Sequence, residues 1–260
     1  LPPSMPDDRD DLPEISKVLT LNPTAPRHEW MIENDEARQA VRAYLAANSF
    51  VDSLVGMVLE GLKQSGEEDN TVIVLWSDHG FHLGEKLRWA KRTLWEETTR
   101  VPLIISVPGI KGGQRSHRPV GLIDLFPTLN ELCGLPAKKD LEGVSLVPLL
   151  KNPELKWDRP ALCTFGPNNH TLRSEDFRYT QYADGTEEFY DHRNDPNEWF
   201  NLAGDPQYRS IIRDFRKRLP RINVDALPGS AGSDSPLYGE GKISLQEAMQ
   251  RGLEQLEKGK

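Results

Sequence analysis

Apolar residues recur at intervals of three and four positions between residues 35 and 66, which is the spacing of one face of a helix. Asp35 and Glu36 stand where acidic side chains favour a helix N-terminus, and Gly66 stands where a helix commonly ends. The pattern therefore predicts one long amphipathic helix, with room for a bend near Asn48 and Ser49.

Two short apolar runs follow, at 71–76 and 101–107, and each is closed by turn-forming residues. They predict two buried strands joined by a long polar loop. A shorter helical pattern at 122–133 begins around Asp124 and is followed by Gly134. Helix, strand, long loop and strand in this order are typical of an α/β layered fold.

Beyond residue 151 the pattern favours an antiparallel sheet. Strand-like runs lie at 161–165, 177–183 and 186–190, and Asp184-Gly185 is a typical two-residue hairpin turn. Apolar positions from Tyr208 to Leu219 predict an amphipathic helix on that sheet. We therefore divide the chain into an α/β portion at 1–150, a small antiparallel subdomain at 151–220, and a tail at 221–260.

Both ends of the chain have loop-like composition. The prolines of residues 1–33 predict an extended segment over a surface, and the lack of an initiator Met suggests that the natural protein begins further upstream. Residues 221–241 are rich in Gly, Ser and Pro and are interpreted as a connector. Ser244 and Glu247 form a capping-box pattern that predicts a last helix.

Composition narrows the class of protein. A net charge of −8 and a pI near 5.4 argue against a nucleic-acid-binding surface, which needs clustered excess cations. No uninterrupted apolar run approaches the roughly 20 residues of a membrane span, so we expect none, and the start lacks the regions of a signal peptide. Cys133 and Cys163 are each flanked by leucine and are expected to be buried thiols.

Asp78 and His79 follow the first predicted strand directly, at the edge of the sheet where α/β proteins bind ligands. The carboxylate suits a hard divalent cation, with Ca²⁺ or Mg²⁺ preferred over zinc because no thiolate or histidine cluster accompanies it. As an isolated dipeptide, Asp-His is a weak signal, and a strand-end Asp that caps a turn beside a solvated histidine is the simpler interpretation.

Four cations, Lys86, Arg88, Lys91 and Arg92, follow within fourteen residues of Asp78. They are either a solvated loop or a site for an anionic ester, whose transferring group a lysine and a metal-type carboxylate would stabilise together. No nucleophile is evident among them.

The run S-D-H-G-F-x-L-G-E-K-x-x-W-x-K, followed by V-P-L-I-I-x-V-P-G, resembles the C-terminal signature of type I sulfatases, close to the iduronate-2-sulfatase-like branch. Further matching segments follow in the family's order, from Asp124-Leu125-Phe126-Pro127 through Glu142-Gly143-Val144-Ser145 to Asn194-Asp195-Pro196-Asn197. The resemblance covers about residues 35–205.

This resemblance implies an alkaline-phosphatase-like layered fold and calcium-dependent hydrolysis of sulfate esters, on carbohydrate substrates, in an exported protein. By position, Asp78 and His79 match calcium-site residues and Lys91 matches the lysine that contacts the sulfate. His79 is alternatively a hydrogen-bonding partner of the sulfate, because calcium prefers oxygen ligands. Candidate substrate-binding residues are Phe81, His82, His170 and Arg173.

The chain lacks the motif that is converted to formylglycine, a Cys or Ser followed by x-Pro-x-Arg, and it also lacks the family's N-terminal aspartates. Three interpretations therefore remain open. The chain is the C-terminal part of a sulfatase whose N-terminal half is missing and which is inactive alone, or part of a related phosphate mono- or diesterase, or a non-catalytic module that binds sulfated glycans.

Overall fold

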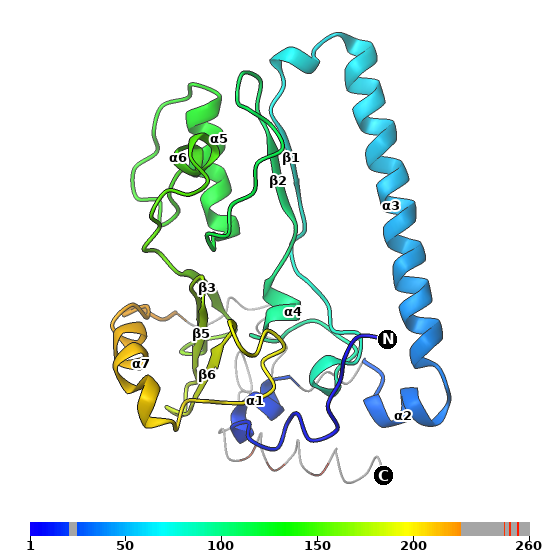
Figure 1. Ribbon diagram of the computed structural model, residues 1–260, viewed down its shortest axis with the longest axis vertical. Helices are drawn as coiled ribbons and strands as arrows, with labels where there is room; N and C mark the ends of the chain where they lie inside the picture. The colour runs from blue at the N-terminus through cyan, green and yellow to red at the C-terminus, as the bar shows by residue number, and fades with distance from the viewer. Residues whose placement is uncertain (21–24, 225–246, 248–249, 251–253, 255–260) are drawn as a thin grey trace.

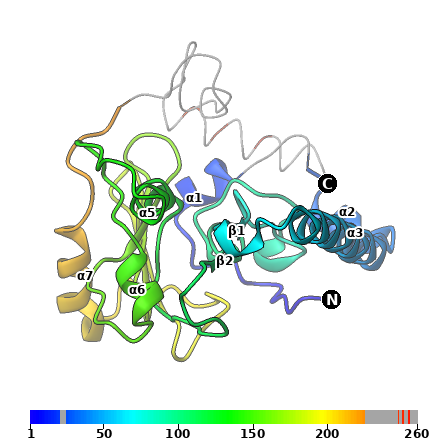
Figure 2. The ribbon, with the colours of Figure 1, turned by 90° about the horizontal axis from the view of Figure 1, so that it is seen from above.

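The computed structural model describes residues 1–20 and 25–224, together with 247, 250 and 254. In Figure 1, a two-stranded sheet has a long helix along one side and two shorter helices on the other, above a second sheet of four strands. Figure 2 shows the same order of layers from above. The mixture of helices with two antiparallel sheets confirms the predicted layered architecture with a small sheet subdomain.

Helix α3 (Ala37–Ser65) is the predicted long helix. It ends at Gly66, which has a φ of 75° and donates its N–H to the carbonyl of Lys63, a left-handed C-cap that glycine adopts without steric cost. No break is present at Asn48 and Ser49. Most of its apolar side chains are exposed, with Val58 at 72%.

Helix α3 also corrects the expectation about membrane spans. It is long enough and apolar enough to cross a bilayer, although none of its most apolar window is buried within the described chain. Length and composition do not distinguish a membrane helix from one whose apolar face packs against protein. Its first turns pack against Met31 and Trp89, whereas the apolar side chains of its second half, such as Val58, remain exposed in the described chain.

Strands β1 (Ile73–Trp76) and β2 (Leu103–Ser106) pair antiparallel, with Trp76 opposite Leu103. The prediction that both are buried is wrong for the described chain, because Trp76 is 47% exposed and Ile104 is 59% exposed. Their polar connection contains two short elements, the 3₁₀ helix η2 (Glu85–Leu87) and helix α4 (Glu96–Thr99).

The helices beside this sheet are η3 (Leu122–Asp124), α5 (Leu125–Leu132) and α6 (Val147–Lys151). Asp124 is fully buried and ties η3 to the segments on both sides of α6: its carboxylate accepts the N–H of Val144 at 2.9 Å and pairs with Arg159 at 2.7 Å. Cys133 follows α5 and is exposed, so the prediction of a buried thiol is wrong there, while Cys163 is half-buried.

The second sheet has the order β3-β4-β5-β6 and is entirely antiparallel. Strands β5 and β6 form the predicted hairpin, with Gly185 at a φ of 85°. Strand β4 was not predicted. The bounds are β3 (Ala161–Thr164), β4 (His170–Arg173), β5 (Phe177–Gln181) and β6 (Glu187–Asp191).

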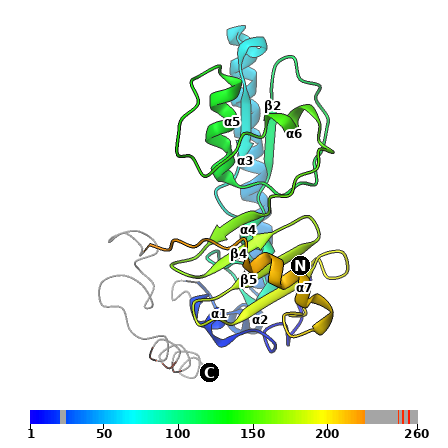
Figure 3. The same cartoon turned by 90° about the vertical axis from the view of Figure 1, so that its left-hand side faces the viewer.

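Different elements cover the two faces of this sheet (Figure 3). The 3₁₀ helix η4 (Pro206–Tyr208) and helix α7 (Arg209–Arg216), where the sequence predicts a helix, pack on one face around Tyr179 and Phe189. Residues that alternate with these two, including Arg178 and Tyr190, face the opposite side.

That opposite side is covered by the N-terminal segment, which corrects the expectation of an extended surface loop. The segment contains helices α1 (Glu14–Leu19) and α2 (His28–Glu33). Ile15 and Leu19 pack with Leu94 and Tyr182. These contacts join residues on both sides of the predicted domain boundary at residue 150. The division into domains itself stays a prediction.

The remaining short element is the 3₁₀ helix η1 (Glu68–Asn70), between α3 and β1. Apart from residues 221–224, 247, 250 and 254, the predicted connector at 221–241 and last helix lie outside the described residues.

Candidate functional site

The candidate site is built on the turn that follows strand β1. Ser77 Oγ donates to the carbonyl of His79 at 2.8 Å, and the N–H of His79 donates to Asp78 Oδ1 at 3.1 Å. These local bonds fix the turn and leave Oδ2, the other carboxylate oxygen of Asp78, without a bond in the turn, with 74% of the side chain exposed. The turn thus presents an available carboxylate at the end of the strand.

His79 connects the turn to the next loop. Its Nδ1 lies 2.8 Å from the carbonyl of Gly80, and its Nε2 lies 2.6 Å from Nζ of Lys91. A carbonyl can only accept, so Nδ1 carries the proton and Nε2 accepts from the lysine. The ring is therefore a neutral imidazole whose free lone pair is held by an ammonium group.

Asp78 and Lys91 thus meet on the same side of His79, since Asp78 Oδ2 lies 3.6 Å from Nε2. Both charged groups therefore lie beside the same ring nitrogen of His79. Lys91 is brought there by a strongly curved loop in which Lys86, Leu87 and Arg92 have positive φ values. Lys91 itself is exposed.

This set of donors can bind an anion and contribute to a cation site. The ammonium of Lys91 suits a tetrahedral anion, while Asp78 supplies a hard oxygen. A Ca²⁺ ion takes about six to eight oxygen ligands. Asp78 provides one carboxylate and the Nε2 lone pair of His79 is already engaged, so these residues alone are too few to complete a calcium site.

The other predicted substrate-binding residues of this loop have different surroundings. Phe81 stacks on Tyr44 with ring centroids 5.9 Å apart. His82 is fully buried, bonds to Thr93 Oγ1 at 2.8 Å and packs edge-on against Trp95. Burial first, and then the charge of Arg88, lower the pKa of His82 to about 3. We correct its assignment to a neutral packing residue behind the loop.

His170 and Arg173 lie on strand β4 and are engaged by protein partners. His170 bonds to Thr164 at 2.9 Å and Asn223 at 2.7 Å. Arg173 donates to Glu96 at 3.1 Å and to His192 at 2.9 Å. Neither forms a hydrogen bond with Asp78, His79 or Lys91, so the described structure does not assemble them into one site.

The loop cations differ from one another. Arg88 is only 8% exposed, and burial lowers its pKa to about 10. Lys86 is 1% exposed and pairs with Asp8 at 2.7 Å, while its ammonium also bonds to the carbonyl of Glu198 and lies over the ring of Tyr190. The interpretation of a solvated cationic loop is therefore wrong for these two residues.

Sequence reasoning missed a buried ionic cluster beneath the loop. Arg178, on strand β5, pairs with both Glu198 and Glu96, and His192 donates to Glu198 at 2.8 Å. Although burial alone would raise it, the pull of Arg178 and the bond from His192 lower the pKa of Glu198 to about 2. The sequence did contain one signal for this cluster: Arg178 lies between the aromatic residues of a predicted strand, at a position expected to face inward.

Three members of this cluster, Glu96, His192 and Glu198, are close enough together for a metal ion. However, the guanidinium of Arg178 already bridges the two carboxylates, and Arg173 bonds the remaining nitrogen of His192. A metal ion would have to displace these cations, so we assign no metal here.

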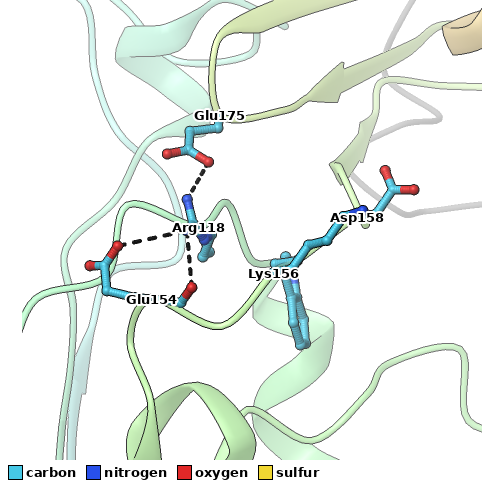
Figure 4. Close-up of a pocket in the computed structure, with 6 residues that line it drawn as sticks. Arg118, Glu154, Lys156, Asp158 and Glu175 are labelled. Carbon is cyan, nitrogen blue, oxygen red and sulfur yellow. Dashed lines mark hydrogen bonds and ion pairs between the residues drawn. The ribbon is translucent and has the colours of Figure 1, made fainter.

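A polar hollow of about 460 Å³ lies near the junction of the two sheets and is lined by none of the predicted site residues. In Figure 4, Arg118 points between Glu175 and Glu154, with which it forms ion pairs. Because its central cation is neutralised, we assign the hollow no role. Its lining residues are Arg118, Glu154, Lys156, Trp157, Asp158 and Glu175.

Comparison with known families gives two overlapping matches. The profile of the family described as Sulfatase matches residues 6–135, and that described as "N-sulphoglucosamine sulphohydrolase, C-terminal" matches residues 84–225.

Curated relatives agree with these profiles. A sulfatase of Formosa agariphila is 43% identical over 86% of this chain and 44% of its own length. An N-acetylglucosamine-6-O-sulfatase of Bacteroides thetaiotaomicron is 35% identical over 70% of this chain and 35% of its own length. The chain therefore spans less than half the length of these two relatives.

Solved structures share the fold. A structure described as a 2-O GAG sulfatase has a TM-score of 0.69 and 27% identity, and covers 83% of this chain and 50% of its own. A phosphonate monoester hydrolase from Silicibacter pomeroyi has a TM-score of 0.69 and 25% identity, and covers 84% and 49% respectively.

Proposed function

Because this chain belongs to the sulfatase family, we propose that it supplies the Asp78, His79 and Lys91 part of a site that hydrolyses sulfate esters on carbohydrates. The observation that carries the proposal is the convergence of an exposed carboxylate and an ammonium on one neutral imidazole. The names of the relatives, which include a sugar 6-O-sulfatase and a 2-O GAG sulfatase, support the carbohydrate substrate class.

Lys91 has the clearest role in such a site. Its ammonium is exposed, and its one described hydrogen-bonding partner is the neutral His79, so it can approach the non-bridging oxygens of a sulfate group without breaking an ion pair. A fixed positive charge stabilises the negative charge that develops on those oxygens in the transition state. When the anion attracts Lys91, Nε2 of His79 becomes free to accept a hydrogen bond from a hydroxyl group of the substrate.

Asp78 is proposed to contribute one carboxylate oxygen to a Ca²⁺ site. Bound calcium would draw charge from the sulfate oxygens, and its other ligands would come from residues outside this chain. The nucleophile is proposed to be a formylglycine that also lies outside residues 1–260, because neither Cys133 nor Cys163 is followed by Pro-x-Arg at the required spacing.

A second candidate is hydrolysis of phosphate or phosphonate esters. The structural similarity to a phosphonate monoester hydrolase favours it, because the TM-score equals that of the GAG sulfatase. A lysine and a metal-bound oxygen ligand would serve a phosphoryl group equally well.

The test is an assay of the complete polypeptide on matched pairs of 2-O- and 6-O-sulfated or phosphorylated sugars, together with a phosphonate monoester. We expect sulfate esters to be preferred, activity to be lost with chelator, and Ca²⁺ to restore it. The variant Asp78→Asn should raise the Ca²⁺ concentration needed for half-maximal activity. Preference for the phosphorylated member of each pair would replace this proposal by the second candidate.

A further inference from the structure

The buried ionic cluster is tied to the candidate site by an unbroken series of contacts, which begins at Arg178. All three guanidinium nitrogens of this residue are used: they bond to Glu198, to Glu96, and to the carbonyl of Leu94 at 3.1 Å. Arg178 is 1% exposed and Glu198 is fully buried. Their positions relative to each other are therefore fixed by directional bonds as well as by packing.

The next contact joins Glu198 to the start of helix α4. The second carboxylate oxygen of Glu198 accepts the backbone N–H of Glu96 at 2.9 Å. Glu198 itself has a φ of 58°, a backbone conformation that is rare for a residue with a side chain. The ionic cluster thus fixes the first residue of helix α4 through this hydrogen bond.

Helix α4 in turn holds the turn that carries the site. The N–H of Gly80 donates to the carbonyl of Thr98 at 2.8 Å. The backbones are so close that a Cβ on Gly80 would lie 1.9 Å from the carbonyl oxygen of Glu97. The carbonyl of Gly80 then receives Nδ1–H of His79. Gly80 is therefore fixed by α4 on one side and fixes the ring of His79 on the other.

From this series we propose that Arg178 and Glu198 are positioning residues for His79 and Lys91: they act through α4 and Gly80 to hold the imidazole where its Nε2 meets the lysine. This inference rests on the proposed function and adds a requirement to it. The small antiparallel subdomain contributes to the chemistry by setting the geometry of a loop that it underlies. A shift of about 1 Å in a reacting group can reduce a rate by about 100-fold.

The principal variant is Glu198→Gln, which keeps the size of the side chain and removes its charge. Its matched control is Glu187→Gln, which breaks the ion pair between Glu187 and Arg216 in the same subdomain, on the α7 side. Both are made in the complete polypeptide. The readouts are kcat and KM for the preferred ester, and amide hydrogen exchange of residues 77–83.

We expect Glu198→Gln to lower kcat by about tenfold or more with KM changed less than about threefold, because the charge contacts of the substrate are unaltered. Exchange at 77–83 should quicken, while exchange in strand β4 stays as in the wild type. Glu187→Gln should leave both kcat and the exchange of 77–83 unchanged, even where it lowers Tm. Arg178→Lys should lower kcat less than Arg178→Met does, because lysine keeps the positive charge.

A Glu198→Gln variant that is less stable but has wild-type kcat and wild-type exchange at 77–83 would overturn the inference, because the cluster would then serve stability alone. If Glu198→Gln does not fold, Arg178→Lys takes its place with the same two outcomes. Exchange at 77–83 can be measured without catalysis, so a wild-type protein that hydrolyses no sulfate ester would refute the proposed function and still leave the positioning contacts tested.

Discussion

Nζ of Lys91 lies 2.6 Å from Nε2 of His79, although the two residues are twelve positions apart and belong to different parts of the loop. The ammonium is thereby held at the site before any anion arrives. Since the hydrogen-bonding partner is neutral, no opposite charge has to be displaced when a sulfate group binds.

Replacing Lys91 by methionine should reduce sulfate ester hydrolysis by about 100- to 1,000-fold, the usual cost of losing one group that stabilises transition-state charge. The measurement is kcat of the complete polypeptide on the preferred ester. Lys156→Met is the control, because Lys156 is also exposed but lines the separate polar hollow. Equal effects of the two substitutions would contradict a specific role for Lys91.

The buried pair of Lys86 and Asp8 should be important for stability. Asp8→Asn is expected to lower the free energy of unfolding by about 3–5 kcal/mol, because it leaves the Lys86 ammonium buried without its counter-charge. The double variant Asp8→Asn, Lys86→Met should recover part of this loss.

Urea unfolding followed by circular dichroism measures both effects. The exposed pair of Glu14 and Lys17 provides the comparison, and Glu14→Gln should change the unfolding free energy by less than about 1 kcal/mol. A double variant as unstable as the single Asp8 variant would refute the charge-burial explanation.

Glu97 should make stability depend on pH. Burial first, and then repulsion from Glu198, raise the pKa of Glu97 to about 7, above its ordinary value of 4.5. Between these two values the folded state holds a proton that the unfolded state has lost, so the contribution of Glu97 to stability falls as pH rises from about 4.5 to about 7.

The variant Glu97→Gln should therefore be more stable than the wild type at pH 8, by up to about 3 kcal/mol, and equally stable at pH 4. Unfolding free energies at the two pH values provide the check. The opposite order, with the variant less stable at pH 8, would mean that the carboxylate has a favourable partner when ionised.

The exposed apolar faces should make residues 1–260 self-associate in isolation. Val58 on α3, Ile104 on β2 and Phe126 on α5 are 72%, 59% and 51% exposed. Such surfaces favour association, so light scattering should rise with protein concentration, and Ile104→Lys combined with Val58→Glu should reduce it. A soluble monomer that unfolds cooperatively would contradict this expectation.

The sequence predicted the elements whose pattern is local. Helix α3 was identified within two residues of its observed start and one of its end because its apolar period and its terminal Gly66 are both contained in the segment. The same holds for the β5–β6 hairpin around Gly185. Strand β4 was missed, because its buried positions include His170 and Thr171, which form no apolar run.

The candidate site was predictable only in part, for a related reason. Asp78, His79 and Lys91 were identified from one continuous motif, and the structure brings them together. Lys86 looked like the other cations of its loop, because burial of an ammonium depends on partners far away in the chain. Spacing within the motif carries no information about such partners.

Lys86 is bonded to residues 78 positions before it and 112 positions after it. Closing loops of that length costs entropy, and the ammonium must leave water as the contact forms, so we expect this joint to assemble late in folding. Burying the Lys86 ammonium with only Asp8 or only Glu198 in place would give little net stabilisation. The first residues of the chain and the sheet near Glu198 should therefore become ordered together. Removing the first ten residues should then make the structure around Glu198, almost two hundred residues further along the chain, less ordered.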